Sequence, residues 1–465
     1  MQALPRCAGA RPTTRAAAAL RRNATRQETR SSFICRSCLS LPNRTFSSSA
    51  RCNSNDIGNR ASSTPAPTTP PPSSGYAALP SRRIISIAGV DAAKFLQGMI
   101  TSNMNDLTTP GRPVAGFYTG FLQATGRVLY DVFVYPDTLG LGGSQESLSD
   151  GGPPTSFLIE CDDARAGALL RHLKKYKLRS KFKIQLLEPE ECAVWQAWND
   201  ASFSAAGQNG AAEGANHSKL ITDLLPDQQG KIILPDPRSP TMGLRVLGRP
   251  GSSSPAALNS VQAEPSDAAA YRVRRYLDGV AEGATEILPD AALPLEANMD
   301  WMGGIDFRKG CYLGQELTIR TKHRGVVRKR ILPVVVYGED EAVPERLEYR
   351  PLAVGEGQEG EGLSAADVPH LSSIGRTGRK GRSAGSFLDG VGNIGLGLCR
   401  LQMMTDVQLP GEAEAAAFDP SKEFLMQWGG DEEGNGAQKV KVKAFVPEWL
   451  RSKISSEGNG EAPPS

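Results

Sequence analysis

Short alternations of apolar and polar residues run through the chain between residues 76 and 330. Alternation with a period of two predicts strands at 83–87, 116–122, 127–135, 156–161, 182–187, 193–198 and 242–247. Apolar residues three and four apart predict helices at 92–100, 163–176, 268–279 and 317–324, the first with Asp91 as its N-cap. Because strands and helices follow one another without a regular βα alternation, the pattern predicts an α+β fold.

A different pattern follows Gly325. Apolar stretches at 330–337, 385–401 and 440–447 are short and rich in glycine. Short strands with frequent glycines are typical of a small antiparallel barrel or sandwich. We therefore expect one region at 76–330 and a C-terminal antiparallel β-barrel at 331–450.

Several stretches carry little that could form a core. They are rich in Gly, Ala, Ser, Pro or charge, and lie at 51–75, 138–154, 200–218, 250–268, 338–384 and 451–465. Such composition buries too little apolar surface to offset the entropy of ordering, so we expect surface loops or disorder there. The prolines between 287 and 300 likewise argue against a long regular element.

The first fifty residues have the composition of a targeting sequence. Residues 1–55 contain ten arginines, no lysine and one acid, Glu28. An Arg-rich, Ser-rich, acid-poor start is typical of a mitochondrial transit peptide, so residues 1–50 predict import into the mitochondrial matrix, with processing near Ser47. The pair Cys35 and Cys38 lies in this segment and has no second ligand pair, so we predict no metal site there.

Charge and hydropathy exclude two classes of protein. Without residues 1–55, the chain holds 43 basic and 49 acidic residues, whereas a nucleic-acid-binding domain is usually broadly basic. No run of eighteen apolar residues occurs, so a membrane span is not expected. The eight cysteines have irregular spacing, which does not indicate a disulfide framework.

The stretch 306–316, Asp-Phe-Arg-Lys-Gly-Cys-Tyr-Leu-Gly-Gln-Glu, concentrates the candidate chemistry. Cys311 follows Arg308 and Lys309 at an expected helix start, and both cations and a helix N-terminus favour thiolate over thiol. Such a cysteine could ligate iron, attack an electrophile or exchange with a disulfide; the alternative is a buried, inert cysteine.

The neighbours of Cys311 leave more than one role open. Lys309 could hold an anion or set the charge of Cys311, or be a solvated lysine. Gln315 and Glu316 could orient a ligand or cap the helix. Eight Lys or Arg against one acid between residues 308 and 330 favour an anionic ligand or an acidic partner, or form a solvated face.

The segment Lys309-Gly310-Cys311-Tyr312-Leu313-Gly314-Gln315-Glu316 also resembles the signature of a known family. It is similar to the hallmark of the folate-binding YgfZ family, relatives of the glycine-cleavage T-protein, and within it to the mitochondrial iron–sulfur cluster assembly factor type. Further similar segments lie at 89–92, 95–98, 101–103, 126–128, 295–300, 318–325 and 392–395. The resemblance covers about 76–447.

This resemblance implies a T-protein-like folate-binding fold and an assembly factor for [4Fe–4S] enzymes that works with A-type carriers. It implies tetrahydrofolate as a cofactor, with Glu296 holding the pterin and Asn103, Asp131 and Tyr118 as weaker candidates for the same channel. Since a cluster usually needs four ligands, Cys311 would share a transient cluster with a partner's thiolates. The alternative is a folate-dependent aminomethyl or methyl transferase, although no counterpart of the T-protein's catalytic aspartate is assigned.

Overall fold

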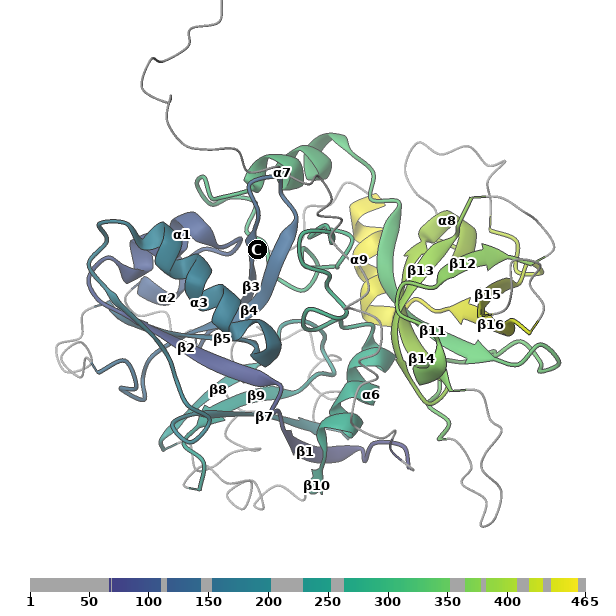
Figure 1. The fold of residues 1–465 in the computed structure, drawn as a ribbon, viewed down its shortest axis with the longest axis horizontal. Coiled ribbons are helices and arrows are strands. Elements are labelled where there is room, and N and C mark those ends of the chain that lie inside the picture. The colour runs from purple at the N-terminus through teal and green to yellow at the C-terminus, as the bar shows by residue number, and fades with distance from the viewer. Residues whose placement is uncertain are drawn as a thin grey trace, which may run out of the picture. The chain divides into compact units, whose positions relative to one another are not determined.

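A computed structural model describes residues 67, 69–109, 115–143, 153–201, 229–251, 263–351, 364–377, 382–407, 418–429 and 436–458. Expectations for residues 1–66, including the transit peptide and Cys35 with Cys38, lie outside these residues. The described part has an α+β fold with two five-stranded sheets and a closed six-stranded barrel (Figure 1). The predicted fold class is therefore confirmed.

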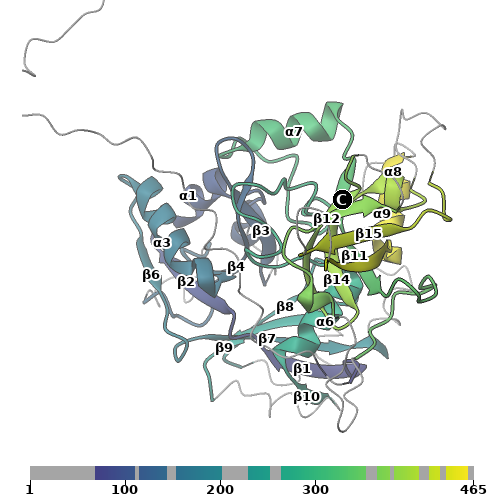
Figure 2. The same ribbon diagram turned by 45° about the vertical axis from the view of Figure 1, so that its right-hand side comes forward.

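The first sheet carries the helices nearest the signature segment. Its order is β3-β4-β5-β2-β6 with antiparallel neighbours throughout. Its strands are β2 (Arg82–Ala88), β3 (Phe117–Leu122), β4 (Val128–Pro136), β5 (Ser156–Asp162) and β6 (Lys183–Leu186). The helices α1 (Ala92–Met99) and α3 (Asp163–Lys177) lie along the same face of this sheet (Figure 2). Their buried apolar residues and Leu107 of α2 (Asn105–Thr108) belong to one cluster with residues of that face.

The second sheet has the order β10-β1-β7-β9-β8, in which only the β1–β10 pair is parallel. Its strands are β1 (Ser74–Ala78), β7 (Ala193–Asn199), β8 (Lys231–Pro235), β9 (Leu244–Gly248) and β10 (Glu264–Ser266). Helix α6 (Ala268–Asp278) starts with Asp267, whose side chain accepts a hydrogen bond from the amide of Ala270, and ends at Gly279 in the left-handed region.

A common core joins the two sheets. The inward residues of β3, β4 and β5, among them Tyr118, Phe133 and Leu158, belong to the same cluster as Trp198 of β7 and Leu247 of β9. Helix α6, the turn-rich segment 279–314 and residues of the C-terminal barrel such as Ile331 and Leu396 also belong to this cluster. The signature segment leaves this core and leads into α7 (Gln315–Arg324).

The C-terminal part closes into an antiparallel barrel of order β11-β14-β13-β12-β15-β16, with β16 pairing back onto β11. Its strands are β11 (Lys329–Tyr337), β12 (Ser373–Arg376), β13 (Gly385–Val391), β14 (Ile394–Arg400), β15 (Phe424–Trp428) and β16 (Gln438–Ala444). Short helices η4 (Ala365–Asp367), α8 (Leu401–Met404) and α9 (Glu448–Gly458) accompany them. Closure leaves no exposed strand edge, and it decides between the expected barrel and sandwich.

Several local expectations were wrong. Asp91 is the N-cap residue of α1 as predicted, but its side chain makes no capping hydrogen bond, because its carboxylate accepts one from the backbone amide of Lys181 instead. Regular structure also occurs inside stretches expected to be loops or disorder. These elements are β10, η4, β12 and most of α9. Each is short and is ordered by contacts with distant strands or helices, which composition does not record.

Candidate functional site

Lys309 fastens the signature segment to the far end of α1. Its Nζ donates hydrogen bonds to the carbonyls of Gln97 and Ile100 at 2.8 Å and of Ser102 at 2.7 Å. An ammonium group has three donors, and all three are used here. The carbonyls at a helix C-terminus otherwise lack partners, and a cation there also interacts favourably with the helix dipole. Lys309 therefore acts as a C-terminal cap supplied from more than 200 residues away.

Lys309 is almost fully buried from solvent. The residue is 7% exposed, and burial lowers the pKa of its ammonium group to about 8, which the nearby Asp306 partly opposes. At neutral pH most of the molecules still carry the charge and its three donors. The roles expected for Lys309, holding an anion or setting the charge of Cys311, stay predictions, and this geometry favours the structural role.

Two glycines hold the segment against the β3–β4 hairpin. Gly314 lies in the left-handed region at φ 81°, and an added Cβ would overlap the carbonyl oxygen of Gln123. Gly126, at φ 86° in the hairpin turn, would place a Cβ 2.7 Å from Cβ of Leu317. The backbones can approach this closely only because neither residue has a side chain.

Cys311 lies in the irregular part of this fastened segment and is exposed. A Cβ on the preceding residue, Gly310, would meet no heavy atom within 4 Å, so the approach to the cysteine is open. Cys161, Cys192 and Cys399 are buried, and burial raises the pKa of each of these thiols to about 12. Among the cysteines that the structure describes, Cys311 is the accessible one.

The expected helix start was misplaced. Helix α7 begins at Gln315, with Gly314 as its N-cap, so Cys311 precedes the first helical residue by four positions. Gln315 is half-buried, and its backbone amide donates a hydrogen bond to the carbonyl of Tyr312 at 3.3 Å. Glu316 is exposed in the first turn, where a carboxylate is favoured by the helix dipole. Neither side chain has a hydrogen bond to another described side chain, so their ligand roles stay predictions.

Asn103 lies beside the capped end of α1. Its Oδ1 accepts hydrogen bonds from Nε2 of Gln97 and from the amide of Asn105, both at 3.1 Å. Gln97 in turn gives its backbone carbonyl to Lys309. Asn103 is thus brought to the same corner as the signature segment, where it organises the chain after α1.

Asp131 and Tyr118 lie elsewhere, at a buried ion cluster between the two sheets. We define this cluster by its members Arg82, Asp131, Glu160, Asp236, Arg238, Arg245, Tyr271 and Glu282. Asp131 accepts two hydrogen bonds of 3.2 Å from the amide of Gly283, and burial raises the pKa of its carboxyl group, which Arg82 partly opposes. The Tyr118 ring lies 5.7 Å from the guanidinium of Arg238, and its hydroxyl is buried without a hydrogen bond.

The cluster's charges compensate one another. Glu160 accepts hydrogen bonds from Arg82 at 2.7 Å and from Arg245 at 2.8 Å. Glu282 accepts hydrogen bonds from Arg238 and Arg245. Burial by itself would raise the pKa of Glu282, but the surrounding arginines outweigh it and hold this pKa well below its usual range. Removing one partner from such a network leaves a buried charge unpaired, which is strongly destabilising.

The pattern of apolar and polar residues did not predict this ion cluster. Glu160 and Arg245 occupy single positions within otherwise apolar strands, and alternation alone assigns such positions to the solvent face. The available signal was a charged residue flanked on both sides by apolar residues in a strand that is buried on both faces.

Glu296 occupies a third place, at the junction with the barrel. Its carboxylate is half-buried and pairs with Nζ of Lys329 at 3.1 Å. The backbone around it is fixed, because its carbonyl accepts from the amide of Ile331 and the buried Arg330 donates to the carbonyl of Leu295 at 2.7 Å. Asn298 adopts φ 59° and bonds the carbonyl of Ile331, which secures this turn.

The predicted site residues thus fall into three groups. The first surrounds the capped end of α1 and consists of Asn103, Lys309, Cys311, Gln315 and Glu316. Asp131 and Tyr118 belong to the buried ion cluster, and Glu296 to the barrel junction. No hydrogen bond or ion pair between described residues connects these three groups directly.

Within the described ranges, no three His, Cys, Asp or Glu side chains gather in a way that could hold a metal ion. None of the described helices combines the length and apolar composition needed to cross a bilayer.

Known proteins resemble the chain in both sequence and fold. The C-terminal β-barrel domain of CAF17 matches residues 328–452. The aminomethyltransferase T of the glycine cleavage system from Bartonella henselae has a similar fold, with TM-score 0.51 and 14% identity over 82% of this chain and 87% of that one. The T-protein-like fold with a C-terminal antiparallel barrel is therefore confirmed.

Two fungal relatives match most of the chain. Both are called iron–sulfur cluster assembly factor IBA57 homolog, mitochondrial. The one from Pyricularia oryzae is 48% identical and covers 83% of this chain and 87% of its own length. The one from Chaetomium globosum is 43% identical and covers 91% of this chain and 94% of its own length. At this identity and coverage, the chain belongs to the IBA57 family of mitochondrial iron–sulfur cluster assembly factors.

Proposed function

We propose that this protein is a mitochondrial assembly factor for [4Fe–4S] proteins and that it works in the matrix. Its membership of the IBA57 family supports the assembly role and the mitochondrial location. The observation that carries the proposal is the exposure of Cys311 on a backbone fixed by Lys309 and by two close glycine contacts. A thiol that is both accessible and positioned suits transfer of a metal cluster, since the sulfur must reach a partner without unfolding its own loop.

In this proposal the iron–sulfur cluster is the cargo that the protein passes on. Four ligands are the usual requirement of an iron–sulfur cluster, and Cys311 supplies one. The remaining thiolates would come from an A-type carrier, which delivers the cluster, or from the client enzyme, which receives it. Aconitase-type and radical-SAM enzymes are the proposed clients.

Glu296 is the proposed contact for tetrahydrofolate. A pterin presents paired N–H donors, which a carboxylate accepts in the bidentate manner known for guanidinium. The Glu296 side chain is 18% exposed and has a single described cationic partner, Lys329, so it retains acceptor capacity and fits this group. When bound, a tetrahydrofolate would supply a site for one-carbon chemistry; the chain's own contribution at Glu296 is to orient the ring.

Asp131 and Tyr118 fit the cofactor less well. Asp131 is already bonded by Gly283 and both residues are buried in the ion cluster, with 4% and 0% exposure. The unpaired hydroxyl of Tyr118 is the single feature of this pair that favours a ligand. We therefore rest the folate proposal on Glu296.

Replacing Cys311 tests the assembly role. In cells depleted of the endogenous protein, wild type should restore aconitase activity and protein lipoylation, whereas Cys311→Ser should not. Gly310→Ala is the matched control, because the added methyl group enters open space next to the same cysteine. Full restoration by Cys311→Ser at normal protein levels would overturn the proposal.

Two further measurements separate the alternatives. Anaerobic mixing with an A-type carrier should yield a cluster-bearing complex with wild type and not with Cys311→Ser. Conversion of tetrahydrofolate into its methylene or methyl form by the purified protein, when an aminomethyl or methyl donor is supplied, would instead favour a one-carbon transferase. The fold likeness to an aminomethyltransferase is the reason to run this second assay.

A further inference from the structure

The turn between α3 and β6 exposes an apolar side chain in a costly conformation. Leu178 is 86% exposed, with φ 47° and ψ −112°, and the amide of Ser180 bonds the carbonyl of Lys177 at 2.9 Å. These angles are close to those of the first central position of a type II′ turn, which is normally glycine. A leucine there is strained and also presents its side chain to water, so neither local conformation nor burial accounts for it.

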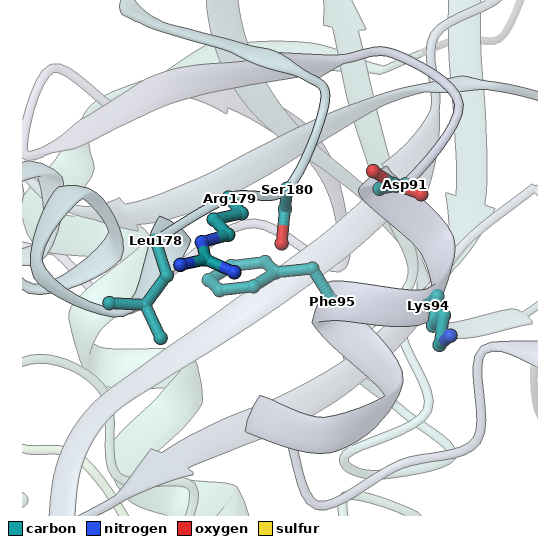
Figure 3. A pocket seen from close by; sticks show the side chains of 6 residues that line it. All are labelled: Asp91, Lys94, Phe95, Leu178, Arg179 and Ser180. Carbon is teal, nitrogen blue, oxygen red and sulfur yellow. The ribbon is translucent and has the colours of Figure 1, made fainter.

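A surface pocket of about 770 Å³ lies next to this turn. Figure 3 shows the Phe95 ring between the turn residues Leu178 and Arg179 on one side and Lys94 of α1 on the other. Phe95 is half-buried and held by Phe182, with ring centroids 4.9 Å apart. Val90, directly before the pocket residue Asp91, is 73% exposed. The pocket therefore has an apolar floor with exposed apolar residues at its edges.

Two cations, Lys94 and Arg179, line the pocket, and more lie in the adjoining segment of the chain. The segment 171–183 has seven Lys or Arg and no acid, and Lys94 adds another from α1. Six of the seven are exposed, namely Arg171, Lys174, Lys175, Arg179, Lys181 and Lys183. Cations in the last turn of α3 are favoured by the helix dipole, but this effect falls off within that turn and does not explain those from Arg179 onward.

Among the residues that line the pocket, the single carboxylate, Asp91, is outnumbered by Lys94 and Arg179. Asp91 already accepts a hydrogen bond of 2.6 Å from the amide of Lys181. Within the described ranges, none of the six exposed cations forms an ion pair with an acidic side chain. The pocket thus combines an apolar floor with an excess of positive charge.

We propose that this surface, defined by Val90, Lys94, Phe95, Leu178, Arg179 and Lys181, docks an acidic segment of a partner protein. One apolar side chain of that segment would enter the pocket and contact Phe95 and Leu178, while its carboxylates would face the cations. A protein segment fits better than an anionic membrane, because one apolar side chain of a segment can enter the pocket, whereas lipid headgroups would meet its apolar floor. The proposal is independent of the chemistry at Cys311.

The strain at Leu178 provides a sharp test. Leu178→Gly removes the strain together with the exposed side chain, so it should keep or raise the melting temperature while weakening binding. The probe is a fluorescein-labelled peptide of Glu and Asp with one central Phe, titrated with the full-length protein by anisotropy. Loss of the buried contact should weaken binding about tenfold. Replacing the peptide's Phe by Ser should produce a similar loss with wild type and little further loss with Leu178→Gly.

Leu371 supplies the matched control. It is also an exposed leucine in the left-handed region, at φ 64° and 48% exposure, but it lies before β12 of the barrel. Leu371→Gly should bind the peptide like wild type. Arg179→Gln with Lys181→Gln should weaken binding and reduce its dependence on salt.

Equal peptide binding by wild type and Leu178→Gly would overturn the proposal. So would equal loss in Leu178→Gly and Leu371→Gly. A parallel experiment measures binding of the protein to vesicles of equal parts phosphatidylcholine and phosphatidylglycerol. Strong vesicle binding that is lost in Leu178→Gly, with no peptide binding, would replace the protein partner by a membrane surface.

Discussion

Lys309 donates a hydrogen bond of 2.8 Å to the carbonyl of Ile100, 209 residues earlier in the chain. Together with the bonds to Gln97 and Ser102, this contact makes the lysine of the signature segment a cap for α1. The segment that displays Cys311 is consequently anchored on the sheet and helix layer.

Lys309→Met should therefore destabilise the protein by about 2–3 kcal/mol, because three buried carbonyls lose their partner. Chemical denaturation measures this change. Lys439→Met, at an exposed position of β16, is the control and should change the free energy of unfolding by less than about 0.5 kcal/mol. Unchanged stability of Lys309→Met, with loss of assembly activity, would indicate anion binding or tuning of Cys311 instead.

The low pKa of Lys309 predicts a specific dependence on pH. Its folded value of about 8 lies below the unfolded value of about 10.4, so between these values the unfolded chain binds the additional proton. Stability from this group therefore rises as pH increases through that window and is constant below pH 8. Between pH 7 and 9.5, wild type should gain about 2 kcal/mol relative to Lys309→Met. A relative loss would mean that the three carbonyls favour the charged form more than burial opposes it.

The two glycines that flank Cys311 should respond differently to the same substitution. Gly314→Ala forces a side chain into the left-handed region and against the carbonyl of Gln123, which should cost about 2–4 kcal/mol and lower assembly activity. Gly310→Ala should stay within about 0.5 kcal/mol of wild type. Thermal unfolding of both variants checks the prediction, and similar melting temperatures would show that the contact with the hairpin is easily relaxed.

Alkylation should separate Cys311 from the three buried cysteines. With pKa values of about 12, Cys161, Cys192 and Cys399 have about one thiolate per thousand at pH 9, and raising pH from 7 to 9 should not make them reactive. Among the four cysteines that the structure describes, iodoacetamide should modify Cys311 first in the native protein and all four in denaturant. Peptide mass mapping follows the reaction; early modification of a buried cysteine would contradict the assigned exposures.

Glu296→Gln tests the folate proposal without disturbing the fold. Because the pair with Lys329 is partly exposed, its loss should cost less than about 1 kcal/mol of stability. Affinity for tetrahydrofolate, measured by calorimetry, should fall about tenfold when the carboxylate no longer accepts two N–H donors. Glu190→Gln, at an exposed position between β6 and β7, should retain wild-type affinity. Equal affinities for wild type and Glu296→Gln would place the pterin elsewhere.

The sequence by itself determined the elements whose periodicity is local. The helices α1, α3 and α6 and the strands β3, β4, β5 and β7 lie close to their predicted ranges, since three- and fourfold or twofold spacing of apolar residues is set within each segment. Short elements such as β10 and β12 carry no such pattern, and pairing with β1 and β15, which lie far away in the chain, orders them.

The roles of the charged residues were decided by the tertiary structure. In the sequence, Lys309 is a cation near a cysteine. In the structure, its ammonium group donates its hydrogen bonds to backbone carbonyls near residue 100. Glu160 and Arg245 read as solvent-facing strand positions, yet they meet between the sheets. A buried charge is stable only where other segments bring partners to it, and that arrangement depends on packing between distant parts of the chain.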